Sequence, residues 1–177
     1  MNLDWTVVWD NRALFLSGVG VTFTLAVVTM AISIPAGIAV MLVRQYAPRP
    51  FALVATCFVE LFRNVPLLLL VFWAYYAIPR MMGMSIGNVA TGVIALVLNV
   101  TAYNSENFRA GVNSIRKGQL EAGLSLGMSW WEAMRKIVLP QATRRIIPVL
   151  ASTWVSLFKA TSLVSTIGVG AARAISR

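Results

Sequence analysis

Long apolar stretches separated by short polar segments dominate the chain. The first of them, residues 18–43, has 26 positions without a single charged side chain. At about 1.5 Å per residue, a helix of this length crosses a hydrocarbon core of roughly 30 Å. Pro35 lies inside the stretch, and a membrane helix tolerates it because neighbouring groups satisfy the freed carbonyl. We therefore predict a membrane-spanning helix over residues 18–43.

Three further apolar stretches predict spans over residues 53–78, 89–105 and 146–169. Pro66 divides the first of these three, so a kinked helix is expected there. Together the four stretches predict an all-α integral membrane protein, with a single transmembrane domain and a bundle of about four spanning helices.

The interval from residue 110 to 145 is different, because it has no apolar run of spanning length and is rich in Lys and Arg. We predict that it is a loop. The short segment with Arg44 and Arg49 is also basic, which makes it cytoplasmic by the positive-inside rule and leaves the N-terminus outside. The same alternation of sides places the 110–145 loop in the cytoplasm.

Composition narrows the classes of function. Of the 177 residues, 58% are apolar and 12% are charged, which is more apolar surface than a soluble domain of this size can bury. Cys57 is the one cysteine and histidine is absent, so no zinc or transition-metal ligand set and no cofactor site is expected. The net charge of +9 is spread between apolar runs, a pattern that favours membrane topology and not nucleic acid as the partner.

The pattern E-x-F-R occurs twice, at Glu60–Arg63 and at Glu106–Arg109, each at the cytoplasmic side of a predicted span. At spacing i, i+3 the carboxylate and the guanidinium meet on one helix face. We predict a structural ion pair in each case, with a role in gating or subunit contact as the alternative.

Within the basic loop the residues predict two short helices. Residues 119–126 form the first, Gly127 interrupts it, and Ser129 with Glu132 has the spacing of a capping box that begins the second. Pro140 is expected to end the second helix. A loop this well defined on a cytoplasmic face indicates docking to a partner.

The loop resembles the EAA loop of ABC importer permeases, in which E-A-A, three residues, G and nine residues precede I-x-L-P. The matching residues are Glu121, Ala122, Gly123, Gly127, Ile137, Leu139 and Pro140. One position departs from the pattern, since Gly123 stands where the family usually has alanine. For Glu121 alone, a solvated helix charge would be the simpler interpretation, but the full spacing favours docking.

Residues 60–66, 108–115 and 158–169 are similar to segments of the polar amino acid branch of these permeases, which includes histidine, glutamine and glutamate permeases. The resemblance implies a type I importer permease in a bacterial cytoplasmic (inner) membrane, crossing it several times. Its implied partners are cytoplasmic ATP-binding subunits, a second permease chain that is identical or paralogous, and a periplasmic or extracellular solute-binding protein. Family members carry a further span after the region where this chain stops, so we expect the last span to be missing.

Polar side chains inside the predicted spans are candidates for a translocation pathway, because ionisable groups in a membrane are costly. Lys159 is the one charge in its stretch, close to Thr161 and Ser162, and Arg63 is a further candidate. A snorkelling side chain or a partner for Glu60 is the structural alternative for Lys159. Asn99 and Thr101 are better suited to hydrogen bonds between helices.

We therefore predict a membrane subunit of an ATP-driven importer for a polar amino acid, with glutamate, aspartate or glutamine as candidates. The chain has no G-x-x-x-x-G-K-[ST] loop, so ATP hydrolysis belongs to a partner and the chain itself is not an enzyme. An ATP-independent channel or secondary carrier is the alternative, and it leaves the spaced loop residues unexplained. A membrane-embedded enzyme lacks a nucleophile–base set.

Overall fold

The computed structural model describes residues 12–83 and 88–175, which are almost entirely helical and contain no strand. Side chains are described throughout these ranges apart from positions 13–15, 82, 88–89 and 162–175. The elements, in chain order, are α2 (Arg12–Tyr46), α3 (Arg49–Asn64), α4 (Leu67–Met82), α5 (Asn88–Asn113), α6 (Lys117–Ser125), α7 (Trp130–Ala133), the π-helical turn η1 (Met134–Val138) and α8 (Leu139–Ile175). The predicted all-α class is confirmed.

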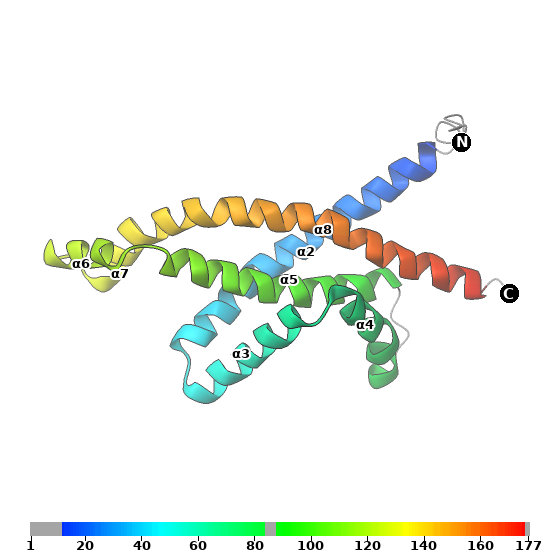
Figure 1. Cartoon of the computed structure of the whole chain (residues 1–177), viewed down its shortest axis with the longest axis horizontal. Helices are drawn as coiled ribbons and strands as arrows, with labels where there is room; N and C mark the ends of the chain where they lie inside the picture. The colour runs from blue at the N-terminus through cyan, green and yellow to red at the C-terminus, as the bar shows by residue number, and fades with distance from the viewer. Residues whose placement is uncertain (1–11, 84–87, 176–177) are drawn as a thin grey trace.

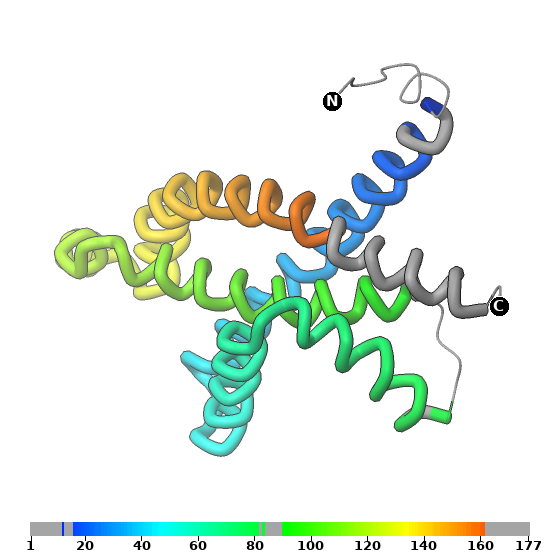
Figure 2. The backbone as a smooth tube through the Cα atoms, turned by 45° about the vertical axis from the view of Figure 1, so that its right-hand side comes forward, coloured from blue at the N-terminus to red at the C-terminus, as the bar shows by residue number. Residues whose placement is uncertain are grey.

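The long helices form an elongated bundle. Helices α5 and α8 lie side by side along the long axis, and α2 packs across both of them (Figure 1). Helices α3 and α4 lie against the other side of α5. Helices α6 and α7 project at one end of the bundle (Figure 2).

Helix α2 contains the predicted first span. Residues Leu16–Tyr46 form a stretch of 31 residues that, among the described helices, is the one long and apolar enough by itself to cross a membrane. Pro35 lies inside α2 without ending it. Many of its large apolar side chains, such as Val19 and Phe23, are exposed, which suits contact with lipid chains.

Pro66 forms a sharp corner, so the expected kinked helix over residues 53–78 is wrong. Helix α3 ends at Asn64, Val65 is extended, and α4 begins at Leu67 after a bend of 109°. Proline disfavours helical conformation in the residue before it and has no N–H to continue the ladder, so the helix stops instead of bending. The pair α3–α4 passes the length and apolarity test only when both parts are taken together.

Helices extend into both ends of the predicted 110–145 loop. Helix α5 continues to Asn113, and α8 begins at Leu139, before the expected start at residue 146. Pro140 does not end a helix, because it lies in the first turn of α8 directly after η1. The helical path is continuous here, and the π-type bond from the Leu139 N–H to the Met134 carbonyl directly precedes the proline, so the irregular turn accommodates the missing N–H.

Two buried clusters hold the helices together. The first joins α2, α4, α5 and α8 through Ala26, Met30, Val71, Ala74, Ala95, Leu96, Val100 and Leu157. The second lies towards the α6–α7 end and consists of Met41, Phe108, Ile115, Val138, Ala142 and Ile146. Glycines bring helices close: a Cβ on Gly37 would lie 2.9 Å from the Cβ of Asn104, and one on Gly111 would lie 2.2 Å from Cγ1 of Ile146.

Candidate functional site

The turn between α6 and α7 is a Schellman motif centred on Gly127. The Gly127 N–H donates to the Leu124 carbonyl at 3.0 Å, and the Met128 N–H donates to the Gly123 carbonyl at 3.1 Å. Gly127 has φ +81°, in the left-handed region where a side chain costs roughly 1–2 kcal/mol. The predicted interruption at Gly127 is therefore confirmed, and it needs glycine for its backbone conformation.

The second loop helix begins with the predicted capping box. The Glu132 N–H donates to Ser129 Oγ at 3.3 Å, and the Ser129 N–H donates to Glu132 Oε2 at 3.1 Å. The hydrogen bond from the Ser129 N–H to the carboxylate, followed by the ammonium of Lys136, lowers the pKa of Glu132. Both partners favour the ionised carboxylate, so the loop geometry and the charge of Glu132 support each other.

Gly123 lies at the contact between the two arms of the loop. It is buried, and a Cβ there would lie 2.8 Å from Cδ1 of Ile137 and 3.0 Å from the Cβ of Ala133. Ile137 is half-buried against it. The glycine at a position where alanine is usual thus allows a closer approach of α6 to α7 and η1.

The remaining residues of the E-A-A…I-x-L-P pattern lie on the surface of the protein. Glu121, Ala122, Leu139 and Pro140 are exposed. The loop also exposes apolar side chains, since Leu126 keeps 79% of its accessible surface and Trp131 keeps 72%. The outer surface of the loop therefore combines a carboxylate with apolar side chains, which is the composition of a docking surface.

A second polar cluster lies where α2, α3 and α5 meet. The carboxylate of Glu106 accepts a hydrogen bond from Arg44 Nη1 at 2.9 Å and is bound by Arg109 one helical turn away, as predicted for the second E-x-F-R pattern. The first pattern is different: Arg63 Nη1 lies 4.0 Å from Glu106 Oε2, and Glu60 accepts from the side-chain amide of Asn64. The predicted Glu60–Arg63 pair is wrong, because α3 packs on α5 and turns Arg63 towards it.

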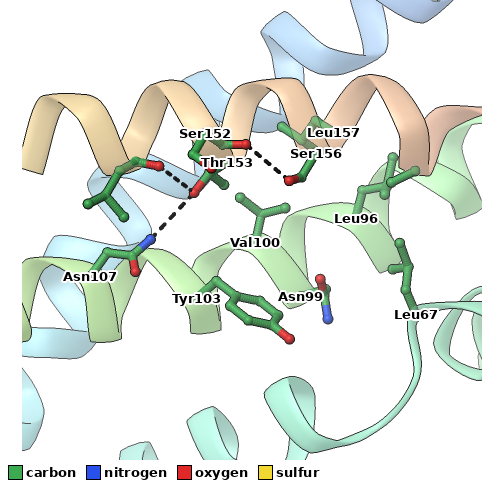
Figure 3. A pocket seen from close by; sticks show the side chains of 12 residues that line it. Leu67, Leu96, Asn99, Val100, Tyr103, Asn107, Ser152, Thr153, Ser156 and Leu157 are labelled. Carbon is green, nitrogen blue, oxygen red and sulfur yellow. Dashed lines mark hydrogen bonds between the residues drawn. The ribbon is translucent and has the colours of Figure 1, made fainter.

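A cavity of about 400 Å³ opens between α5 and α8. It is lined by Leu67, Leu96, Asn99, Val100, Tyr103, Asn107, Val149, Ser152, Thr153, Ser156, Leu157 and Ala160. Its polar side chains come from both helices, and Asn107 Nδ2 donates to Thr153 Oγ1 at 3.5 Å across the gap (Figure 3). No lining residue is charged, so the cavity suits a small polar solute.

The wall of the cavity also supports the α3–α4 corner. Asn99 Nδ2 donates to the Phe62 carbonyl at 2.7 Å, and Tyr103 Oη donates to the Arg63 carbonyl at 3.2 Å. These carbonyls end α3 and have no partner within their own helix. Asn99 is thus the interhelical partner that was predicted, whereas Thr101 Oγ1 is buried without a hydrogen-bond partner among the described residues.

Among the predicted pathway residues, Arg63 contacts the lining of the cavity through the ring of Tyr103. Thr161 is buried and donates to the Phe158 carbonyl of its own helix at 2.8 Å. Lys159 is exposed, and the side chain of Ser162 lies outside the described residues. Tyr103 and Asn107 of α5 and Ser152, Thr153 and Ser156 of α8 were not predicted. The spacing of Asn99, Tyr103 and Asn107 at four-residue steps is the signal that could have found a polar stripe on one helix face.

Comparison with known proteins places these features in a family. Residues 33–176 match the sequence model of the family described as "Binding-protein-dependent transport system inner membrane component". The arginine transport system permease protein ArtQ of Bacillus subtilis is 35% identical over 170 residues, covering 96% of this chain and 78% of that protein. The glutamine transport system permease protein GlnP of Escherichia coli is 34% identical, with the same coverage.

Solved structures agree with this assignment. A chain in the crystal structure of an amino acid ABC transporter with histidines superposes with a TM-score of 0.87 at 34% identity, covering 95% of this chain and 78% of that chain. The MetNI methionine ABC transporter in an inward-facing conformation has a TM-score of 0.65 at 18% identity, which supports the fold alone. The chain belongs to the family of inner membrane components of binding-protein-dependent transport systems.

Proposed function

We propose that this chain is the membrane-spanning permease subunit of an ATP-driven importer for a polar amino acid. It crosses the bacterial cytoplasmic membrane several times, with about four spans in residues 1–177. Relatives named for arginine, glutamine and glutamate/aspartate transport support an amino acid as the solute. The cavity between α5 and α8 has an uncharged lining of mixed polar and apolar side chains, which is compatible with such a solute passing beside these helices.

The observation that carries the proposal is the well-defined, solvent-exposed α6–α7 loop at one end of the bundle (Figure 1). Its conformation is fixed by the Gly127 turn, the capping box and the Gly123 contact, while Glu121 and Ala122 remain exposed. We assign to Glu121, Ala122, Gly123, Gly127, Ile137, Leu139 and Pro140 the coupling to a cytoplasmic ATP-binding subunit. A second permease chain and a solute-binding protein complete the proposed assembly.

Motion of the loop reaches the bundle directly in this arrangement. Helix α7 passes through η1 into α8 without a break, and α8 forms one wall of the cavity. Val138 and Ala142 belong to the same buried cluster as Phe108 of α5. A partner that moves the loop therefore moves both walls of the cavity.

Uptake of radiolabelled arginine, glutamine and glutamate by membrane vesicles with the assembled importer tests this function. The proposal predicts that uptake of at least one of them is abolished by orthovanadate, which blocks ABC ATPases, and persists when a protonophore collapses the proton gradient. Uptake that survives vanadate and stops with the protonophore would identify a secondary carrier instead.

A further inference from the structure

The guanidinium of Arg63 is incompletely satisfied by its neighbours. Arg44 and Arg109 occupy the Glu106 carboxylate with short contacts, whereas Arg63 Nη1 lies 4.0 Å from Oε2. Arg63 Nε is buried and has no hydrogen-bond partner among the residues that the structure describes. A buried charged donor without an acceptor is costly, so this position favours an additional acceptor.

Charge also favours an anion here. Three guanidinium groups surround the single carboxylate of Glu106, which leaves two positive charges in excess within this cluster. The Arg63 side chain keeps 33% of its accessible surface, on atoms other than the buried Nε, so a small solute can reach part of it. Arg44, by contrast, keeps 12% and also contacts Thr56 Oγ1 through Nε at 3.4 Å. Arg63 is therefore the member of the cluster that is both reachable and short of partners.

Arg63 lies beside the cavity. Its Cζ is 5.5 Å from the centroid of the Tyr103 ring, which lines the cavity, and its backbone carbonyl accepts the hydrogen bond of Tyr103 Oη. The stacked ring limits the directions in which the guanidinium can turn. None of the lining residues carries a charge, so an ionic group of a solute in the cavity needs a counter-charge from outside the lining, and Arg63 contacts that lining through Tyr103.

We propose that Arg63 binds the carboxylate of the transported amino acid at the edge of the cavity next to Tyr103. The planar fork of a guanidinium matches the two oxygens of a carboxylate and can form paired, charge-assisted hydrogen bonds. The inference rests on the proposed import function and adds a recognition residue to it. Because every amino acid has this carboxylate, Arg63 orients the solute and leaves the choice among amino acids to other residues.

A comparison of two ligands tests the inference without any mutation. The purified importer assembly, without its solute-binding protein, is titrated with whichever of L-arginine, L-glutamine and L-glutamate it transports, and with the α-carboxamide of that amino acid. The carboxamide lacks the anionic oxygens, so we expect it to bind at least about tenfold more weakly than the acid. Equal affinity of the acid and the carboxamide would overturn the proposal, as would competition by inorganic phosphate that matches competition by the amino acid.

Two variants of Arg63 and one control locate the contact. Arg63→Gln should weaken binding of the amino acid by about tenfold or more, and Arg63→Lys should retain part of the affinity because it keeps the charge. Arg80→Gln removes an exposed cation at the end of α4 and should leave affinity unchanged. Unchanged binding by Arg63→Gln would contradict the proposal.

The outcomes separate this inference from the import function. Vanadate-sensitive uptake together with equal binding of acid and carboxamide would remove the role of Arg63 and keep the importer. If Arg63→Gln does not assemble, the comparison of the two ligands on the unmodified protein decides alone. An absence of ATP-driven uptake of all three amino acids would remove the import function, and the Arg63 proposal with it.

Discussion

The Glu106 carboxylate of α5 accepts a hydrogen bond from the Arg44 guanidinium of α2 at 2.9 Å, and the two side chains keep only 18% and 12% of their accessible surface. The bond joins helices from distant parts of the chain at a point where Arg63 and Arg109 also converge. Glu106 is therefore the one described carboxylate that the three guanidinium groups of this junction share.

Glu106→Gln should destabilise the protein, because it leaves three guanidinium groups facing one another without a counter-charge. We expect the free energy of unfolding to fall by about 2 kcal/mol, less than for a fully buried ion pair. Thermal unfolding in detergent measures the effect. Glu132→Gln, which affects an exposed pair with Lys136, serves as the control and should lower Tm far less. Equal decreases in Tm for both variants would contradict a stabilising role of Glu106 at this junction.

Gly111→Val tests the contact between α5 and α8. A Cβ at this position would lie 2.2 Å from Cγ1 of Ile146, so either the Ile146 side chain must move or the two helices must separate. Overpacking of this kind costs about 1–3 kcal/mol. Gly20→Val meets no atom within 4 Å and provides the matched control. Ile146→Ala should partly restore the Tm of Gly111→Val, and a failure of this rescue would argue against the contact.

Gly123→Leu should open the loop while leaving the bundle folded. The new side chain has no room between Ile137 and Ala133, so α6 must leave α7 and η1. Amide hydrogen exchange should accelerate in residues 117–125 and stay slow in the buried parts of α2 and α5. Gly118→Leu, where a side chain meets open space, should not change exchange in α6.

The capping box should respond to pH. The folded loop lowers the pKa of Glu132, so its contribution to stability is complete above the ordinary pKa range of glutamate and is lost as the pH falls through the lowered value. Exchange at the start of α7 should therefore accelerate on acidification, after correction for the intrinsic rate. In Glu132→Gln the acid-dependent component should disappear, since the amide does not titrate, and its persistence would assign the effect to another group.

The sequence predicted those features that depend on local chemistry. The charge-free stretch of α2, the turn at Gly127 and the box formed by Ser129 and Glu132 all follow from a few neighbouring residues. The positions of proline predicted the ends of helices less reliably. Pro35 is accommodated inside α2, Pro66 makes a corner and Pro140 lies in the first turn of a long helix, and the choice among these depends on packing.

The polar sites depended on tertiary structure and were predicted only in part. The i, i+3 spacing correctly paired Glu106 with Arg109, but the same spacing failed for Glu60 and Arg63 because α5 offers Arg63 another partner. The cavity takes residues from α5 and α8, whose pairing no local pattern specifies. Tyr103 was therefore not predicted as a lining residue. An aromatic side chain on a membrane helix also ordinarily indicates packing.

Copurification from detergent tests the central claim, docking of the α6–α7 loop on an ATP-binding subunit, most directly. Tagged wild-type protein, Gly127→Val and Gly118→Val are isolated from cells that produce the ATP-binding subunit. Gly127 has φ +81°, so valine distorts the turn, whereas valine at Gly118 meets no neighbour. The account predicts recovery of the ATP-binding subunit with the wild type and Gly118→Val, and its loss with Gly127→Val at equal membrane levels. Equal recovery with all three proteins, or none with the wild type, would contradict it.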